Sequence, residues 1–227
     1  MAVGLFIIIL NLSLFFLSPV YLFAQTDTLD EIYKEVVELS RKGNVEELIP
    51  VFEKMLIVQP SNKKVLMDYS VVLSWAGRCN KSIAIYENLQ DEIPAYVLSA
   101  AAKCYRDLKQ FDKAIEIYKE ISQKRPKQSD ALIGLAYSYA DNLQYSEALE
   151  TLKPLISSQP ESLEPIFAKG YVYERMIEYF KAYQLYEDII QRYPDNKRAW
   201  SAKINVLSSL GAYQPALEIA LANQDKV

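Results

Sequence analysis

The chain has 227 residues, of which 51% are hydrophobic and 24% charged, a composition typical of a globular protein rather than a disordered one. Its formal net charge is only −4, with acids and bases mixed throughout, which excludes the basic stripe that a nucleic-acid partner requires. Histidine is absent and the six glycines form no phosphate-binding motif, so the commonest general base and metal ligand are missing and no cofactor or metal is expected.

The first 24 residues form a segment of their own. Residues 1–24 contain no charged side chain, and the apolar run from Leu5 to Leu17 has the length of a signal-peptide core. Cleavage after the small residue Ala24 would leave a short linker, residues 25–28, before the folded part. The alternative is an uncleaved anchor, because the same segment could just span a bilayer of about 30 Å.

Both interpretations predict that the rest of the chain is exported. A cleaved signal predicts a protein in the periplasm or at the outer membrane of a Gram-negative bacterium. An uncleaved anchor predicts a protein of the inner membrane with its folded part outside the cytoplasm.

Proline recurs at a nearly constant spacing in the remainder. The recurring prolines are Pro60, Pro94, Pro126, Pro160 and Pro194, which lie 34, 32, 34 and 34 residues apart. A period of 34 residues made of two amphipathic helices is the signature of the tetratricopeptide repeat, which this sequence resembles. The resemblance implies an all-α chain, a right-handed solenoid of antiparallel helix pairs. Six repeats are expected, at 29–62, 63–94, 95–128, 129–162, 163–196 and 197–227.

Small side chains recur at fixed positions, counted so that the recurring proline is position 32 of each repeat. Position 20 is alanine in the last four repeats: Ala114, Ala148, Ala182 and Ala216. Position 8 is also small in the middle three: Ala102, Ala136 and Gly170. Small residues at these places predict that the two helices of a repeat cross closely.

Position 15 is the expected turn between the two helices. Gly43, Gly77 and Gly211 stand there in three repeats, as a left-handed backbone conformation would favour. In the other three, Lys109, Leu143 and Ile177 replace glycine. These three turns are therefore predicted to be strained or unusually well packed.

In the tetratricopeptide family, positions 2, 5, 9, 12 and 13 of the first helices point into a concave groove. The resemblance therefore implies a binding groove that contains aromatic and charged side chains: Tyr96, Lys103, Arg106, Asp107, Asp130, Tyr137, Asp141, Glu164, Phe167, Tyr171, Glu174 and Arg175. The same positions of the flanking repeats hold Tyr33, Lys64, Met67, Trp75 and Arg198. For each residue taken alone, the alternative is a solvated helix face or local packing.

The groove residues indicate the chemistry of a partner. Flat aromatic rings suit peptides and sugar rings alike, the acids favour cationic groups, and Arg106 and Arg175 could hold carboxylates. A glycan hydrolase would need two carboxylates that face one bond, and evenly scattered acids offer no such pair. We therefore expect binding rather than catalysis.

The two cysteines allow two interpretations. Cys79 and Cys104 fall at positions that face the join between neighbouring repeats, where in an oxidising compartment a disulfide would contribute about 2 to 4 kcal/mol. The alternative is that both are small buried apolar residues.

A closer resemblance concerns the order of features. The segments SRKGN, VVLSWAGRCNKSIAIYENL and ALIGLAYSYADNLQYSEALETLKPL, which follow an export signal, resemble the periplasmic portion of poly-β-1,6-N-acetylglucosamine export porins. In that family the repeats precede a β-barrel pore and meet the polymer or its modifying enzyme. No alternating strands follow the repeats in this sequence, so the resemblance implies a truncated form or a separate periplasmic subunit.

The expected function is that of an exported scaffold. It would bind a protein, or an amine-bearing exopolysaccharide, in its concave groove during cell-envelope assembly or exopolysaccharide export. The alternative is a general periplasmic or membrane-anchored adaptor between proteins, with no polysaccharide role.

Overall fold

The structure, a computed structural model, describes residues 45–89, 92–126 and 128–223 together with Ile32, Val36, Leu39 and Gly43. Every regular element in these ranges is an α-helix, and none of these helices is long and apolar enough to cross a membrane. The expected signal segment, the cleavage after Ala24 and the groove residue Tyr33 lie outside the described residues. The chain divides into two compact units, Met1–Leu89 (unit 1) and Gln90–Val227 (unit 2).

Unit 1 contains helices α2 (Val45–Val58), α3 (Lys63–Trp75) and α4 (Cys79–Tyr86). The side chain of Asn62 accepts a hydrogen bond from the backbone N–H of Val65 at 3.2 Å, which caps the start of α3. Phe52 and Tyr69 stack with their ring centroids 5.7 Å apart. They belong to the core of the unit, which consists of Leu48, Phe52, Met55, Val65, Tyr69, Val72 and Leu73.

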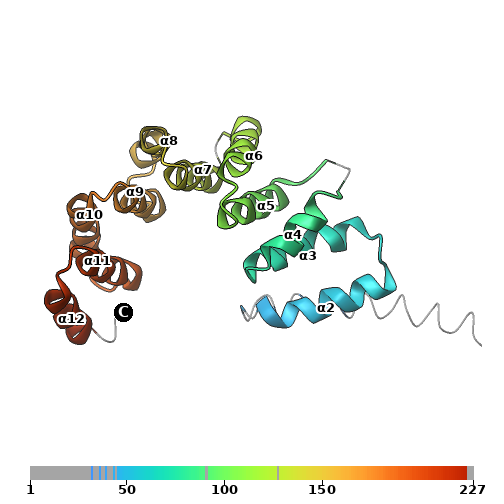
Figure 1. The fold of residues 1–227 in the computed structure, drawn as a ribbon, viewed down its shortest axis with the longest axis horizontal. Helices are drawn as coiled ribbons and strands as arrows, with labels where there is room; N and C mark the ends of the chain where they lie inside the picture. Colours follow the sequence, from blue (N-terminus) through green and yellow to red (C-terminus); the bar gives the residue numbers. More distant parts are fainter. Residues whose placement is uncertain are drawn as a thin grey trace, which may run out of the picture. The chain divides into compact units, whose positions relative to one another are not determined.

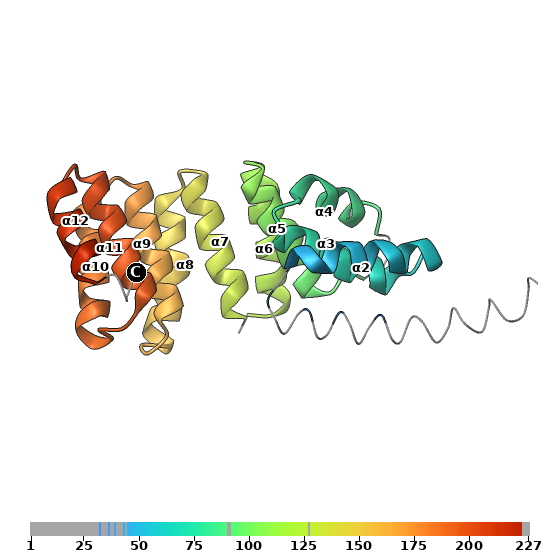
Figure 2. The ribbon, with the colours of Figure 1, turned by 90° about the horizontal axis from the view of Figure 1, so that it is seen from below.

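The described residues of unit 2 form four helix pairs. Their bounds are α5 (Ala95–Asp107), α6 (Phe111–Lys124), α7 (Ser129–Asp141), α8 (Tyr145–Ser158), α9 (Leu163–Arg175), α10 (Tyr179–Arg192), α11 (Lys197–Ser209) and α12 (Tyr213–Ala222). Consecutive helices pack against each other, and α7 also packs against both α5 and α9. Within this unit the odd-numbered helices follow the inner side of an arc and the even-numbered ones the outer side (Figure 1). Figure 2 shows the helices from α7 to α12 standing side by side.

The small residues of the repeat lie where helices meet. Ala102, Ala114, Ala136, Ala148 and Ala182 are completely buried, as the sequence predicts for closely crossing helices. At Gly170 the approach is also close, because a Cβ there would lie 2.5 Å from the hydroxyl oxygen of Tyr186. The packing of α9 against α10 therefore depends on the absence of a side chain at this position.

The turns between paired helices share one geometry, with or without glycine. Lys109, Leu143 and Ile177 have φ angles of 61°, 62° and 62°, close to the 69° to 77° of Gly77 and Gly211. In each turn a backbone N–H donates to the carbonyl five residues earlier, for example Glu178 to Tyr173 at 2.8 Å. This bond closes the end of the first helix and requires a left-handed residue in the turn. The three non-glycine turns are thus strained, as expected.

Candidate partner-binding groove

The first helices of unit 2 lie on the inner side of the arc (Figure 1). We call the surface formed by α5, α7, α9 and α11 the inner face. At its centre lies a hollow of about 220 Å³, the inner hollow. It is lined by Arg106, Tyr137, Phe167, Tyr171, Glu174, Tyr186, Arg198 and Ala202.

Aromatic rings form much of the wall of the inner hollow. Tyr137 of α7 and Tyr171 of α9 meet edge to face, with their ring centroids 5.0 Å apart. Phe167 of α9 and Tyr186 of α10 lie with their centroids 6.0 Å apart. Phe167 and Tyr186 are buried, whereas Tyr137 and Tyr171 are partly exposed. Arg106 lies 5.2 Å from the centroid of the Tyr137 ring, so Tyr171 and the uncovered part of Tyr137 offer apolar surface to a ligand.

Asp141 links three neighbouring helices. Its carboxylate lies 3.6 Å from the Nε of Arg106 on α5 and 3.5 Å from the Nε of Arg175 on α9. It also accepts a hydrogen bond of 2.5 Å from the hydroxyl of Tyr171. Burial and then this bond to Asp141 raise the pKa of Tyr171. The hydroxyl therefore stays protonated at neutral pH and acts as a donor.

Arg198 of α11 closes the other side of the inner hollow. One nitrogen of its guanidinium lies 2.7 Å and 2.8 Å from the two carboxylate oxygens of Glu164 on α9. The same group lies 4.1 Å from the ring centroid of Phe167. Its charge is thus balanced by a carboxylate and its plane is supported by an aromatic face.

Glu174 of α9 differs from the other acids of the inner face. It accepts a hydrogen bond of 2.5 Å from the hydroxyl of Tyr186, and no ion pair joins it to a cation among the described residues. Burial raises the pKa of Glu174, although the bond from Tyr186 opposes that shift. The inner hollow therefore contains a carboxyl group whose negative charge no cation of the described residues pairs with.

The structure brings most of the expected groove residues together. Arg106, Tyr137, Asp141, Glu164, Phe167, Tyr171, Glu174, Arg175 and Arg198 form one continuous cluster across four helices. Lys103 and Asp107 form an ion pair of 2.6 Å on α5 beside that cluster. Tyr96 and Asp130 are exposed near the starts of α5 and α7 and do not line the inner hollow. Lys64, Met67 and Trp75 belong to unit 1. The binding role of these residues stays a prediction.

Tyr186 and Ala202 line the inner hollow although the sequence-based expectation omits both. Tyr186 lies on a second helix, and the expectation takes groove residues only from first helices. The sequence does contain a signal for it, because position 24 is aromatic in four repeats: Phe52, Tyr86, Tyr118 and Tyr186. For Ala202 no signal is evident.

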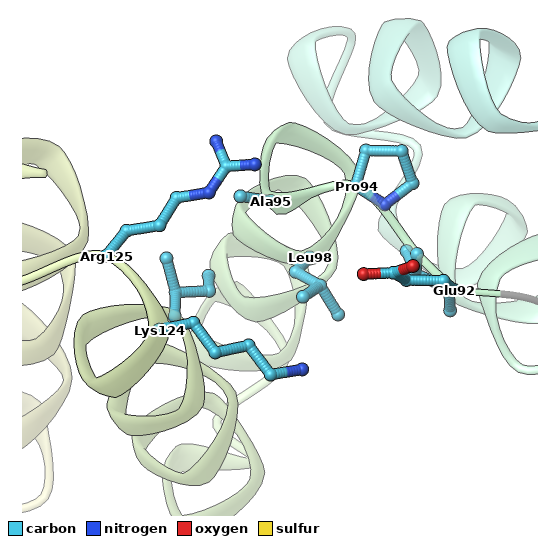
Figure 3. Close-up of a pocket in the computed structure, with 8 residues that line it drawn as sticks. Glu92, Pro94, Ala95, Leu98, Lys124 and Arg125 are labelled. Carbon is cyan, nitrogen blue, oxygen red and sulfur yellow. The ribbon is translucent and has the colours of Figure 1, made fainter.

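A second hollow, of about 560 Å³, lies where α5 begins and α6 ends. Figure 3 shows Leu98 between the charged side chains of Glu92 and Lys124. Lys124 also pairs with Glu120 at 2.7 Å. No aromatic ring lines this hollow, so the inner hollow is the better candidate for a binding site.

Two further expectations concern metal and sulfur chemistry. In the described ranges, no group of three or more acidic or cysteine side chains is arranged to hold a metal ion. Cys79 and Cys104 are both buried, at 5% and 0% exposure. They belong to different units, and their pairing as a disulfide stays a prediction, which mass spectrometry of the unreduced protein would test.

Comparisons with known structures agree with the helical architecture. A tetratricopeptide repeat protein from Parabacteroides merdae is 13% identical, with a TM-score of 0.65 over 87% of this chain and 79% of that one. TTC0263, a tetratricopeptide repeat protein from Thermus thermophilus, is 19% identical, with a TM-score of 0.59 over 73% and 91%. MamA from Desulfovibrio magneticus is 13% identical, with a TM-score of 0.59 over 71% and 93%. At such identities the likeness shows the fold alone.

Comparisons at the level of sequence are more limited. No curated protein sequence matches the chain. Two family models, both described as tetratricopeptide repeat, match residues 105–166 and residues 166–196. The matched segments contain Tyr137, Phe167, Tyr171, Glu174 and Tyr186 of the inner hollow. The inner hollow is therefore built largely on tetratricopeptide repeats, within a helical solenoid of that fold.

Proposed function

We propose that the chain is a binding scaffold and that the inner face of unit 2 holds a segment of a partner protein. The inner hollow carries this proposal, because aromatic rings and charged groups from α5, α7, α9, α10 and α11 converge there. Tyr137 and Tyr171 remain partly exposed although they contact each other, so their rings have free surface. A hollow with apolar walls and a few oriented polar groups is the usual form of a binding site.

The proposed chemistry is binding without catalysis. The ion pairs around Asp141 and Glu164 join successive repeats and give the inner face a fixed pattern of charge. A rigid surface of this kind loses little conformational freedom when a ligand binds. An extended or helical peptide segment could contact several first helices at once, as suits a repeat array.

A selection from a random peptide library on the full chain tests the proposal. Binders should lose affinity when Tyr137→Ala removes a ring from the inner face. The matched control is Phe180→Ala, because Phe180 is 64% exposed on α10 and does not line the inner hollow. Binders that respond equally to both variants, or an absence of binders, would contradict the proposal.

An amine-bearing exopolysaccharide is the second candidate ligand. Its support is the sequence resemblance to export porins, together with the aromatic rings and the unbalanced carboxyl of Glu174, which suit sugar faces and an ammonium group. Partly deacetylated glucosamine oligomers are the probe. If their binding does not depend on Tyr137, Phe167 and Tyr171, this candidate fails.

Export is also part of the proposal, with a place in the periplasm or at the outer membrane. It rests on the uncharged residues 1–24 and the small residue Ala24. Cell fractionation and N-terminal sequencing of the native protein test it. A mature protein that starts at Gln25 supports a cleaved signal, and an intact N-terminus in the membrane fraction supports the anchor.

A further inference from the structure

The acids of the inner face are not equivalent. Asp141 is balanced by Arg106 and Arg175, and Glu164 by Arg198. Glu174 lines the inner hollow and receives only the neutral hydroxyl of Tyr186 as a hydrogen-bond donor among the described residues. A half-buried carboxylate without a cation is costly, so a ligand that supplies the cation would remove that cost.

The geometry around Glu174 leaves room for such a ligand. Its Oε1 atom accepts the hydrogen bond from Tyr186, and no hydrogen bond within the described residues occupies Oε2. Oε2 is also not fully buried, so solvent in the hollow can reach it. A volume of about 220 Å³ is enough for one long side chain but not for a whole peptide.

The surroundings of the carboxyl suit a cation in spite of two nearby arginines. The rings of Tyr137, Phe167 and Tyr171 form walls of the hollow, and ring faces attract cations. Arg106 already lies 5.2 Å from the centroid of Tyr137 and Arg198 4.1 Å from that of Phe167, so Tyr171 is the ring that remains for a cation of the ligand. Arg106 and Arg198 also line the hollow, but each already lies against a carboxylate. The electrostatic repulsion that they exert on an entering ammonium group is therefore reduced.

We propose that the inner hollow takes one lysine side chain of the partner protein, whose ammonium group pairs with Glu174 between the aromatic rings. This inference rests on the proposed function and adds the chemistry of the partner. In the complex the ammonium would donate to Oε2 while Tyr186 continues to donate to Oε1. The partner segment must then run across α9, with its lysine directed toward α10.

Binding measurements on the full chain test the inference with peptides that were selected on it and that depend on Tyr137. Each lysine of such a peptide is replaced by norleucine, which keeps the four carbons of the side chain and removes the ammonium group. We expect one replacement to weaken binding about tenfold or more. Glu174→Gln should weaken the parent peptide by a similar factor and leave the affinity of the norleucine peptide unchanged.

A matched control separates this pairing from a general effect of charge. Glu116→Gln makes the same change in net charge on the exposed side of α6, away from the inner hollow, and should not alter the affinity. Thermal melting at neutral pH should show that the Glu174→Gln variant is folded, so that weaker binding reflects the site.

The possible outcomes distinguish the inference from the proposed function. Selected peptides that depend on Tyr137 but contain no lysine, or that are insensitive to Glu174→Gln, overturn the lysine pocket and leave the scaffold proposal standing. An absence of Tyr137-dependent peptides overturns both. Glucosamine oligomers that bind in a Glu174-dependent manner, where peptides do not, would assign the ammonium group to a polysaccharide and also overturn the inference.

Discussion

Tyr118 and Tyr186 occupy the same place, position 24, in the third and fifth repeats, yet they have different surroundings. The ring end of Tyr118 lies against Gly134, and that of Tyr186 against Gly170. The hydroxyl of Tyr118 donates to the backbone carbonyl of Ser99 over 3.4 Å, a weak bond. The hydroxyl of Tyr186 instead donates to the carboxyl of Glu174 over 2.5 Å.

The difference comes from position 12 of the first helix, which is Arg106 in the third repeat and Glu174 in the fifth. Burial raises the pKa of Tyr118 to about 12, and the charge of Arg106 opposes that shift. Burial and then the hydrogen bond to Glu174 raise the pKa of Tyr186. The ring of Tyr118 lies against position 6 of the next repeat and that of Tyr186 against position 8 of its own repeat, and the residue at position 12 of the first helix determines which charge acts on the hydroxyl.

Adding a methyl group under each ring should have the largest effect. Gly170→Ala places a Cβ 2.5 Å from the hydroxyl oxygen of Tyr186, so it should disturb both the packing and the bond to Glu174. We expect a loss of about 2 to 3 kcal/mol in the free energy of unfolding, after the better helix propensity of alanine is included. Gly134→Ala meets the ring of Tyr118 at 2.4 Å and should lose about 1 to 2 kcal/mol, because the hydroxyl of Tyr118 donates to a backbone carbonyl and not to a charged group. Urea unfolding followed by circular dichroism measures both.

A second change shows whether the ring causes the loss. Tyr186→Leu in the Gly170→Ala background shortens the side chain that the new methyl group meets. The double variant should then be less destabilised than the sum of the two single changes. A strictly additive loss would contradict the contact as the cause.

Removing the hydroxyl groups of Tyr118 and Tyr186 should cost less stability, but the loss should differ more between the two tyrosines. Tyr186→Phe leaves the half-buried carboxyl of Glu174 without its donor, which should cost about 1 to 2 kcal/mol at neutral pH. Tyr118→Phe removes only a bond of 3.4 Å to Ser99 and should cost less than about 0.5 kcal/mol. Equal losses in urea unfolding would show that the bond to the carboxylate of Glu174 contributes no more to stability than the bond to Ser99.

The stability of Glu174→Gln should depend on pH. Burial raises the pKa of Glu174 above its ordinary value of 4.5, so the folded state favours the protonated carboxyl. This stabilisation is complete below the unfolded pKa and is lost as the pH rises through the folded one. Glutamine does not ionise, and the tyrosines of the hollow titrate far above neutrality. The variant should therefore melt at the same temperature as the wild type at about pH 4, and at a higher temperature than the wild type at about pH 7.

Thermal melts with Glu116→Gln as the control check this expectation, because Glu116 is exposed and its substitution makes the same change in net charge. A variant that is less stable than the wild type at neutral pH would mean that Arg106 or Arg198, which line the same hollow, stabilises the ionised carboxylate. Greater stability together with weaker peptide binding would identify Glu174 as a residue kept for binding.

The architecture could be predicted because it depends on local patterns that repeat. The spacing of the prolines and the buried alanines, such as Ala114 and Ala148, indicate paired helices that cross closely, and the structure has both. The positions of Tyr137 and Tyr171 on the inner face follow from the same period. For these residues, the helical repeat alone determines which way the side chain points.

The details of the inner hollow could not be predicted from the same patterns. Whether Arg106 reaches Asp141 depends on how far successive first helices rotate, which no single repeat specifies. Tyr186 was missed because a second helix contributes it, across the gap that Gly170 leaves. The combination of glycine at position 8 and an aromatic residue at position 24, which the fifth repeat has, could reveal such a contact in advance.

The smallest expected effect concerns the turns at position 15 of the third and fifth repeats. Ile177 and Lys109 both adopt left-handed conformations, with φ angles of 62° and 61°, and a β-branched side chain tolerates this less well than lysine does. Ile177 is 73% exposed, so few contacts oppose its removal. Ile177→Gly should therefore raise the free energy of unfolding by about 0.5 to 1 kcal/mol, and Lys109→Gly should change it by less. If urea unfolding shows that Ile177→Gly loses stability, the exposed isoleucine must make a contact worth more than the strain of its backbone.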